Sequence, residues 1–68
     1  MIEIKIDTEF IKLDSLLKLS NLVQSGGEAK ILIQEGKVKL NGETENRRGK
    51  KIHKGDIVEF DKNTIKVV

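Results

Sequence analysis

The stretch SGGEAKILIQEGKVKLNG, residues 25–42, decides the fold, because it holds a helix start, a helix end and a strand turn. Ser25, followed three residues later by Glu28, forms a capping box, which predicts that a helix begins here. The apolar face of that helix would carry Ala29, Leu32 and Ile33. Gly36 follows where a left-handed residue commonly ends a helix.

Beyond Gly36 the period of the pattern changes to two. Val38 and Leu40 are expected to point inward and Lys39 outward, as in a strand with one wet face. Asn41-Gly42 is a strong hairpin-turn signal. The polar segment 43–51, with Gly49 inside it, is expected to start as a second strand and become a loop.

Upstream, apolar and charged residues alternate over residues 2–6, which predicts a strand. From Leu13 to Val23 apolar residues recur at helical spacing, so a first helix is expected before the Ser25 cap. Asp14 would lie in its first turn, where a carboxylate suits the positive end of the helix dipole.

Downstream, Ile52 resumes the apolar pattern and Gly55-Asp56 marks another turn. Segments 57–60 and 65–68 flank residues 61–64 as a last hairpin. The expected architecture is therefore α+β, a two-helix hairpin packed on a small, mostly antiparallel β-sheet, with residues 1–68 as one domain.

Composition limits the function classes. The chain has 68 residues and no cysteine, so its stability depends on packing without disulfides or a thiolate zinc site. A domain this small has little room for a deep catalytic cleft. The alternating N-terminal residues 1–10 do not resemble a signal peptide or a membrane span, so a cytoplasmic protein with no membrane partner is expected.

Thirteen Lys and Arg against eleven Asp and Glu give a net charge of only +2, but the charge is unevenly distributed. Segment 47–54 contains no acid. Its cations are Arg47, Arg48, Lys50, Lys51 and Lys54, and His53 lies among them. A phosphate-binding patch is the favoured interpretation, and an ordinary solvated surface is the alternative. Lys12, Lys18 and Lys30 would extend the patch if the helices present them on the same side.

Other chemistry has weaker support. His53 has no partner in a catalytic motif and is expected to be an exposed loop residue. Glu43 and Glu45 adjoin the turn and are expected to be solvated. Gly26-Gly27 lacks the rest of a P-loop or dinucleotide motif. Two interpretations of this glycine pair stay open, a turn between the helices and a contact to an RNA phosphate. No enzyme activity, cofactor or metal site is expected.

An ordered set of residues resembles the RNA-binding domain typified by ribosomal protein S-four, also called the αL motif. The set is Lys12-Leu13-Asp14, Leu17-Lys18, Ser25-Gly26-Gly27-Glu28-Ala29-Lys30, Ile33, Gly36, Val38, Asn41-Gly42 and Gly55-Asp56. The match covers roughly residues 11–58. It looks like the small stand-alone bacterial members of that family.

The resemblance implies binding to structured RNA, commonly ribosomal or transfer RNA, through the helix pair and the following β-loop. Contacts implied by the family fall on Lys12, Lys18, Ser25, Glu28, Lys30, Lys39 and Asn41, with Glu28 as a possible cap instead. The family usually has arginines where this chain has Gly26 and Lys30. Gly26 lacks the guanidinium that would bind a phosphate through two hydrogen bonds, and Lys30 supplies only a point charge. We expect the loop cations to compensate, namely Arg47, Arg48, Lys50 and Lys51.

The expected partner is therefore an RNA, with the ribosome or its assembly intermediates as its setting, bound by a monomer. Basic side chains would contact about five to eight phosphates and displace counterions, which makes binding depend strongly on salt. The alternative is a protein-interaction module whose basic loop docks an acidic protein partner.

Overall fold

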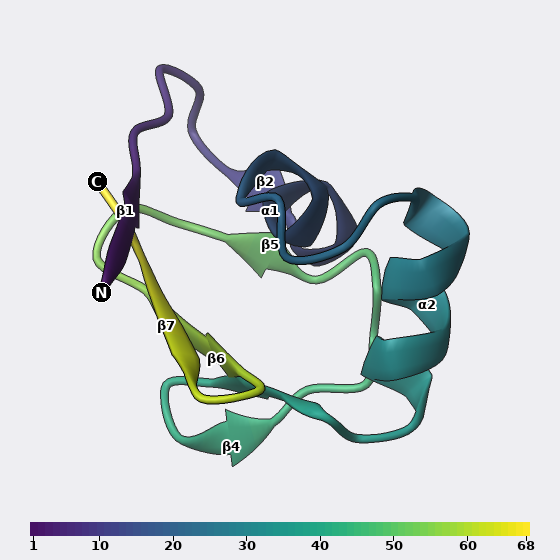
Figure 1. Cartoon of the computed structure of the whole chain (residues 1–68). Coiled ribbons are helices and arrows are strands. Elements are labelled where there is room, and N and C mark those ends of the chain that lie inside the picture. The colour runs from purple at the N-terminus through teal and green to yellow at the C-terminus, as the bar shows by residue number, and fades with distance from the viewer.

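The computed structural model describes all 68 residues, and Figure 1 shows two helices beside a twisted sheet. The elements in chain order are β1 (Ile2–Ile4), β2 (Ile11–Lys12), α1 (Leu13–Leu19), α2 (Gly26–Gln34), β3 (Val38–Leu40), β4 (Glu43–Thr44), β5 (Lys51–Ile52), β6 (Ile57–Phe60) and β7 (Asn63–Val67). This arrangement confirms the α+β class and the two-helix hairpin on a mostly antiparallel sheet. No helix is long and apolar enough to cross a bilayer.

The main sheet has the strand order β1-β7-β6-β3-β4. All its pairs are antiparallel except β1 with β7, which run parallel. The N-terminal strand was expected over residues 2–6, but β1 ends at Ile4. Ile6 still donates a backbone hydrogen bond to the Val68 carbonyl at 3.0 Å, so the two ends of the chain lie together, as Figure 1 shows.

A second, two-stranded sheet pairs β2 with β5 in antiparallel fashion, and we call it the ribbon. Ile11 lies opposite the buried Ile52, and Lys12 lies opposite the exposed Lys51. The sequence did not predict this ribbon, because strands of two residues are too short to show an alternating pattern.

The first helix was expected to continue to Val23, but it ends at Leu19. At the end of the helix, the hydroxyl of the C-cap residue Ser20 donates a hydrogen bond to the Leu17 carbonyl at 2.8 Å. Asn21 then adopts a left-handed conformation with φ of 63°, which cannot continue a right-handed helix. Val23 is nevertheless buried, in the connection that leads to α2.

The core lies between the helices and the inner face of the sheet. Its largest fully buried side chains are Leu13, Leu16, Leu17, Ile33, Val38, Ile52, Val58, Ile65 and Val67. Val38 and Val58 lie on the same sheet face as Phe60 and Leu40, through the registers of β3 and β6. Gly36 has φ of 77° and the Asn41-Gly42 turn has φ of 51° and 88°, which confirms the expected helix end and hairpin turn.

Candidate nucleic-acid interface

The outward face of the ribbon carries two lysines that lie directly opposite each other. Lys12 and Lys51 are register partners, and both are exposed. Like charges in directly opposite positions destabilise a strand pair. Neither lysine forms an ion pair with an acid. The ribbon therefore presents a concentrated positive charge that the protein itself does not neutralise.

The basic loop, residues 45–50, is fixed against the start of α1 by its own backbone. Helix α1 has no side-chain cap, because Lys12 occupies the N-cap position. The Leu13 amide instead donates to the Lys50 carbonyl at 3.0 Å, and the Asp14 amide donates to the Arg48 carbonyl at 3.1 Å. These two bonds satisfy helix-end donors and place the loop next to Lys12.

The ribbon and the loop together form what we call the basic cluster, which consists of Lys12, Arg48, Lys50 and Lys51. Its members come from segments far apart in sequence, and none is in an ion pair. Arg48 and Lys51 are exposed, whereas Lys50 is half-buried. Folding thus gathers part of the predicted patch into one place.

Arg47 differs from the rest of the predicted patch because a glutamate holds it. Arg47 Nε donates to Glu45 Oε2 at 2.9 Å, and Arg47 Nη2 donates to Glu45 Oε1 at 3.2 Å. The Arg47 backbone amide also donates to Glu45 Oε2, at 3.1 Å. The side-chain hydrogen bonds from Arg47 lower the pKa of Glu45 most, against an opposing effect of burial. Part of the Arg47 charge is therefore neutralised.

The expectation that Glu45 is solvated was wrong. Glu45 is 9% exposed and is the one buried charged residue of the chain, whereas Glu43 is exposed as expected. The reason is that the Glu45 backbone turns inward after β4, where its amide donates to the Val38 carbonyl at 3.0 Å. Its carboxylate can be buried because it is fully engaged with Arg47.

A second possible phosphate-binding surface lies where α1 and α2 meet. We call it the helix edge, and it consists of Lys18, Lys30 and the backbone amides of Gly26 and Gly27. A Cβ placed on Gly26 would lie 3.9 Å from Lys18 Cδ, so the Lys18 stem runs beside the start of α2. Lys30 follows Gly26 by four residues and lies one turn further along the same face of α2. The backbone amides of Gly26 and Gly27 donate to no group in the chain. The helix edge therefore offers two amines and two unused amide donors.

Ser25 and Glu28, which the resemblance implied as contacts, hold the start of α2. Ser25 Oγ accepts the Glu28 amide at 3.2 Å, which confirms Ser25 as the N-cap. The reciprocal bond is displaced by one residue, because Glu28 Oε1 accepts the amide of Gln24 instead of that of Ser25, at 2.8 Å. Both side chains are thus engaged in capping.

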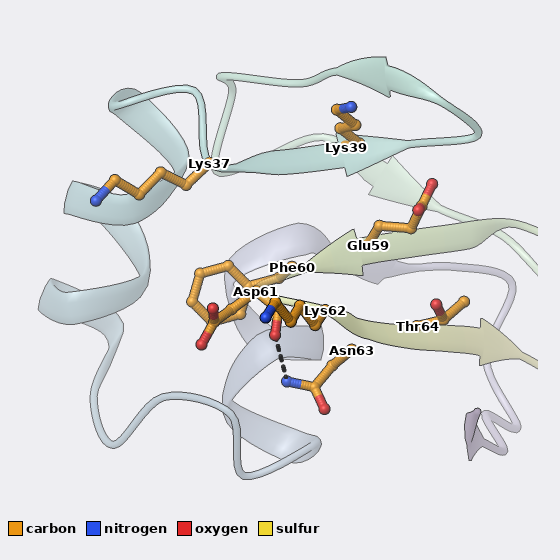
Figure 2. A pocket seen from close by; sticks show the side chains of 8 residues that line it. All are labelled: Lys37, Lys39, Glu59, Phe60, Asp61, Lys62, Asn63 and Thr64. Carbon is orange, nitrogen blue, oxygen red and sulfur yellow. Dashed lines mark hydrogen bonds between the residues drawn. The ribbon is translucent and has the colours of Figure 1, made fainter.

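Lys39 lies on the outer face of the sheet, away from the helices. Its register partners are Glu59 on β6 and Thr44 on β4. Figure 2 shows Lys39 and Glu59 on neighbouring strands at an open hollow whose lining also includes Lys37, Phe60 and Asn63. A carboxylate therefore lies across from Lys39, and the structure does not bring this lysine together with the basic cluster.

Asn41 bridges the β3–β4 hairpin to the start of β6. Asn41 Nδ2 donates to Asp56 Oδ1 at 3.1 Å, and Asn41 Oδ1 accepts the Ile57 amide at 2.9 Å. Both ends of its amide group are thus engaged within the protein. Asp56 also accepts the His53 amide at 2.8 Å, so Asn41 is connected through Asp56 to the end of the ribbon.

Two aromatic rings near the ribbon were not among the predicted site residues. Phe10 and His53 have ring centroids 6.2 Å apart at 54°, and Lys51 Nζ lies 4.9 Å from the Phe10 centroid. Strand alternation places each ring on the same face as a lysine, since Phe10 precedes Lys12 by two residues and His53 follows Lys51 by two. Their meeting depends on the ribbon pairing, which the sequence did not predict.

Comparisons with known proteins agree with one another. The family model described as "S4 domain" matches residues 4–68. The chain is 50% identical over 58 residues to "Probable ribosome maturation protein RlbA" of Bacillus subtilis (strain 168), covering 85% of this chain and 82% of that protein. It is 43% identical over 58 residues to "Putative RNA-binding protein YbcJ" of Escherichia coli (strain K12), covering 85% and 83%.

A solved structure also matches. The solution structure of YbcJ from E. coli superimposes with a TM-score of 0.77 at 38% identity, over 100% of this chain and 87% of that one. Its description reports an αL motif involved in RNA binding. The fold that the sequence resemblance implied is thus found in a homologue of known structure.

Proposed function

The chain belongs to the S4 domain family, and from this premise we propose that it binds structured RNA, of ribosomal or transfer type, without catalysing a reaction on it. The names of its relatives support this proposal, since one is called an RNA-binding protein and another a ribosome maturation protein. The proposed setting is the cytoplasm, with ribosomes or their assembly intermediates as the source of the RNA and a single copy of the chain as the binder.

One observation carries the proposal: folding assembles the basic cluster with none of its members in an ion pair, although Lys50 lies close enough to Glu45 to help lower the pKa of that carboxyl. Lys12 and Lys51 face each other, and loop carbonyls fix Arg48 and Lys50 beside them. A protein gains nothing in stability from adjacent uncompensated cations. A polyanion that bridges them would relieve their repulsion, and the RNA backbone is such a polyanion.

The mechanism that follows is docking by charge and recognition by shape. The basic cluster and the helix edge contact phosphates of one RNA surface and release counterions. The open amides of Gly26 and Gly27 supply directed donors to a phosphate at the start of α2. Few groups are placed to read base edges, so selectivity would come from the shape of a folded RNA.

A filter-binding titration against a structured ribosomal RNA fragment tests the proposal. If the cluster and the helix edge engage about six phosphates, the affinity should fall roughly a thousandfold between about 50 and 200 mM salt. An affinity that does not change with salt would contradict electrostatic docking. A pulldown with and without nuclease separates the alternative, because an acidic protein partner would remain bound after the RNA is digested.

A further inference from the structure

The outward face of the ribbon combines amines with an exposed aromatic ring. Lys12 and Lys51 lie opposite each other, and next along the same face lie Phe10 and His53, whose rings are 6.2 Å apart. The His53 side chain is 53% exposed. A cationic pair beside an open ring matches two parts of a nucleotide, its anionic phosphate and its aromatic base.

We propose that this face binds one unpaired nucleotide of the RNA, with its base stacked on His53 and its phosphate between Lys12 and Lys51. The inference rests on the proposed RNA-binding function and narrows it, because it names the RNA element that the domain selects. Bases in an A-form duplex are stacked on each other and unavailable, whereas a bulged or looped base can be splayed out onto a side chain.

The geometry favours His53 over Phe10 as the platform. The Phe10 ring is half-buried and already carries the Lys51 amine 4.9 Å from its centroid. The two rings are within contact distance of each other, so no base fits between them. The open side of the imidazole remains. Phe10 would support that ring from behind while Lys51 stays close to the phosphate.

The backbone of His53 is fixed by a hydrogen bond, and its ring lies close to Asp56 and Phe10. Its backbone amide donates to Asp56 Oδ2 at 2.8 Å, and its Nδ1 lies 3.9 Å from the same oxygen. Asp56 is the nearest acid to the platform, and its other oxygen accepts a hydrogen bond from Asn41. A platform whose backbone is fixed in advance loses less freedom when a base stacks on it, which favours binding.

The test uses two RNA hairpins with the same stem, one fully paired and one with a single bulged 2-aminopurine nucleotide. The intact protein should bind the bulged hairpin more tightly and quench its fluorescence. His53→Ala should reduce that preference about tenfold while leaving the affinity for the paired hairpin unchanged. His53→Tyr should retain the preference and the quenching, because it keeps a ring, whereas His53→Lys should lose both.

Lys54→Ala is the matched control, because Lys54 is an exposed neighbour without a ring. It should change the affinity for both hairpins equally. Equal binding of the two hairpins by the intact protein, or an unchanged preference in His53→Ala, would overturn the inference and leave RNA binding intact. Binding to neither hairpin at low salt would instead contradict the proposed function itself.

Discussion

The buried carboxylate of Glu45 holds the guanidinium of Arg47 through two hydrogen bonds, with Nε to Oε2 at 2.9 Å and Nη2 to Oε1 at 3.2 Å. This pair sits at the start of the basic loop, where Glu45 directly follows the end of β4. The pair stabilises the fold, because it anchors the loop. It also lowers the affinity for RNA, because it neutralises one of the cations available to bind phosphate.

Glu45→Gln should therefore lower stability and raise affinity for RNA. We expect the free energy of unfolding to fall by about 1 kcal/mol, since the bonds to a charged partner weaken but Arg47 is largely exposed. RNA should bind a few-fold more tightly because Arg47 is released. Urea unfolding and filter binding measure the two effects. Glu43→Gln is the control, because it removes the same charge from an exposed neighbour; identical behaviour of both variants would refute the coupling.

The contribution of Glu45 to stability should depend on pH in the acid range. Hydrogen bonds from Arg47 lower the pKa of Glu45 in the folded state below its ordinary value of 4.5. The folded state thus binds this proton less readily, and the added stability is present above pH 4.5 and lost as the pH falls through the lowered value. The difference in unfolding free energy between the native chain and Glu45→Gln should be constant near pH 7 and shrink below pH 4.5.

The Glu45 contact shows where reasoning from sequence reached its limit. The absence of acids within residues 47–54 was visible, but an acid two positions earlier folds back onto Arg47. Asp56, just after this segment, does the same to the His53 amide. The order of charges along a chain does not show which acid pairs with which base. That pairing depends on the backbone conformation of the loop, which a polar loop sequence specifies only weakly.

Lysines on the two faces of the domain should differ in their effect on RNA binding. Lys12→Gln and Lys51→Gln should each weaken binding several-fold and reduce the slope of log affinity against log salt by about 1. Lys39→Gln, on the outer sheet face across from Glu59, should leave the slope unchanged. Salt titrations of the three variants measure this. A slope change for Lys39→Gln equal to that for Lys12→Gln would mean that the RNA reaches the outer face.

Restoring an arginine at the start of α2 should strengthen binding. Gly26 does not have a positive φ, and a Cβ there would make only an ordinary contact, 3.9 Å from Lys18 Cδ. Gly26→Arg would add a planar, bidentate phosphate donor to the helix edge, and we expect about a tenfold gain in affinity. Gly27→Arg is the control, because it adds the same charge to a neighbouring face of the helix. An equal gain from both would indicate a general charge effect.

Two leucines of α1 should respond very differently to truncation. Leu16 is fully buried, whereas Leu19 is 55% exposed. Leu16→Ala should cost about 2–5 kcal/mol, which is most of the stability that a domain of this size has. Leu19→Ala should cost well under 1 kcal/mol. Thermal unfolding followed by circular dichroism measures both, and a similar loss in the two variants would mean that Leu19 packs against something in solution.

The fold was more accessible from sequence than the site. The Ser25 cap, the Gly36 helix end and the Asn41-Gly42 turn depend on local backbone chemistry, and all three were confirmed. The parallel pairing of β1 with β7 and the ribbon between β2 and β5 join distant segments, and no local pattern specifies them. The rings and lysines of the ribbon face therefore became visible as a group only in three dimensions.

The two carbonyls of Arg48 and Lys50 that cap α1 have a further consequence for measurement. The amide protons of Leu13 and Asp14 are hydrogen-bonded to the loop itself, so their exchange with solvent reports whether the loop is seated on the helix. An RNA bound to the loop should slow this exchange, because it keeps the loop on the helix even without touching either amide. These two hydrogen-bonded amides could report occupancy of the domain by nuclear magnetic resonance without any label on the RNA.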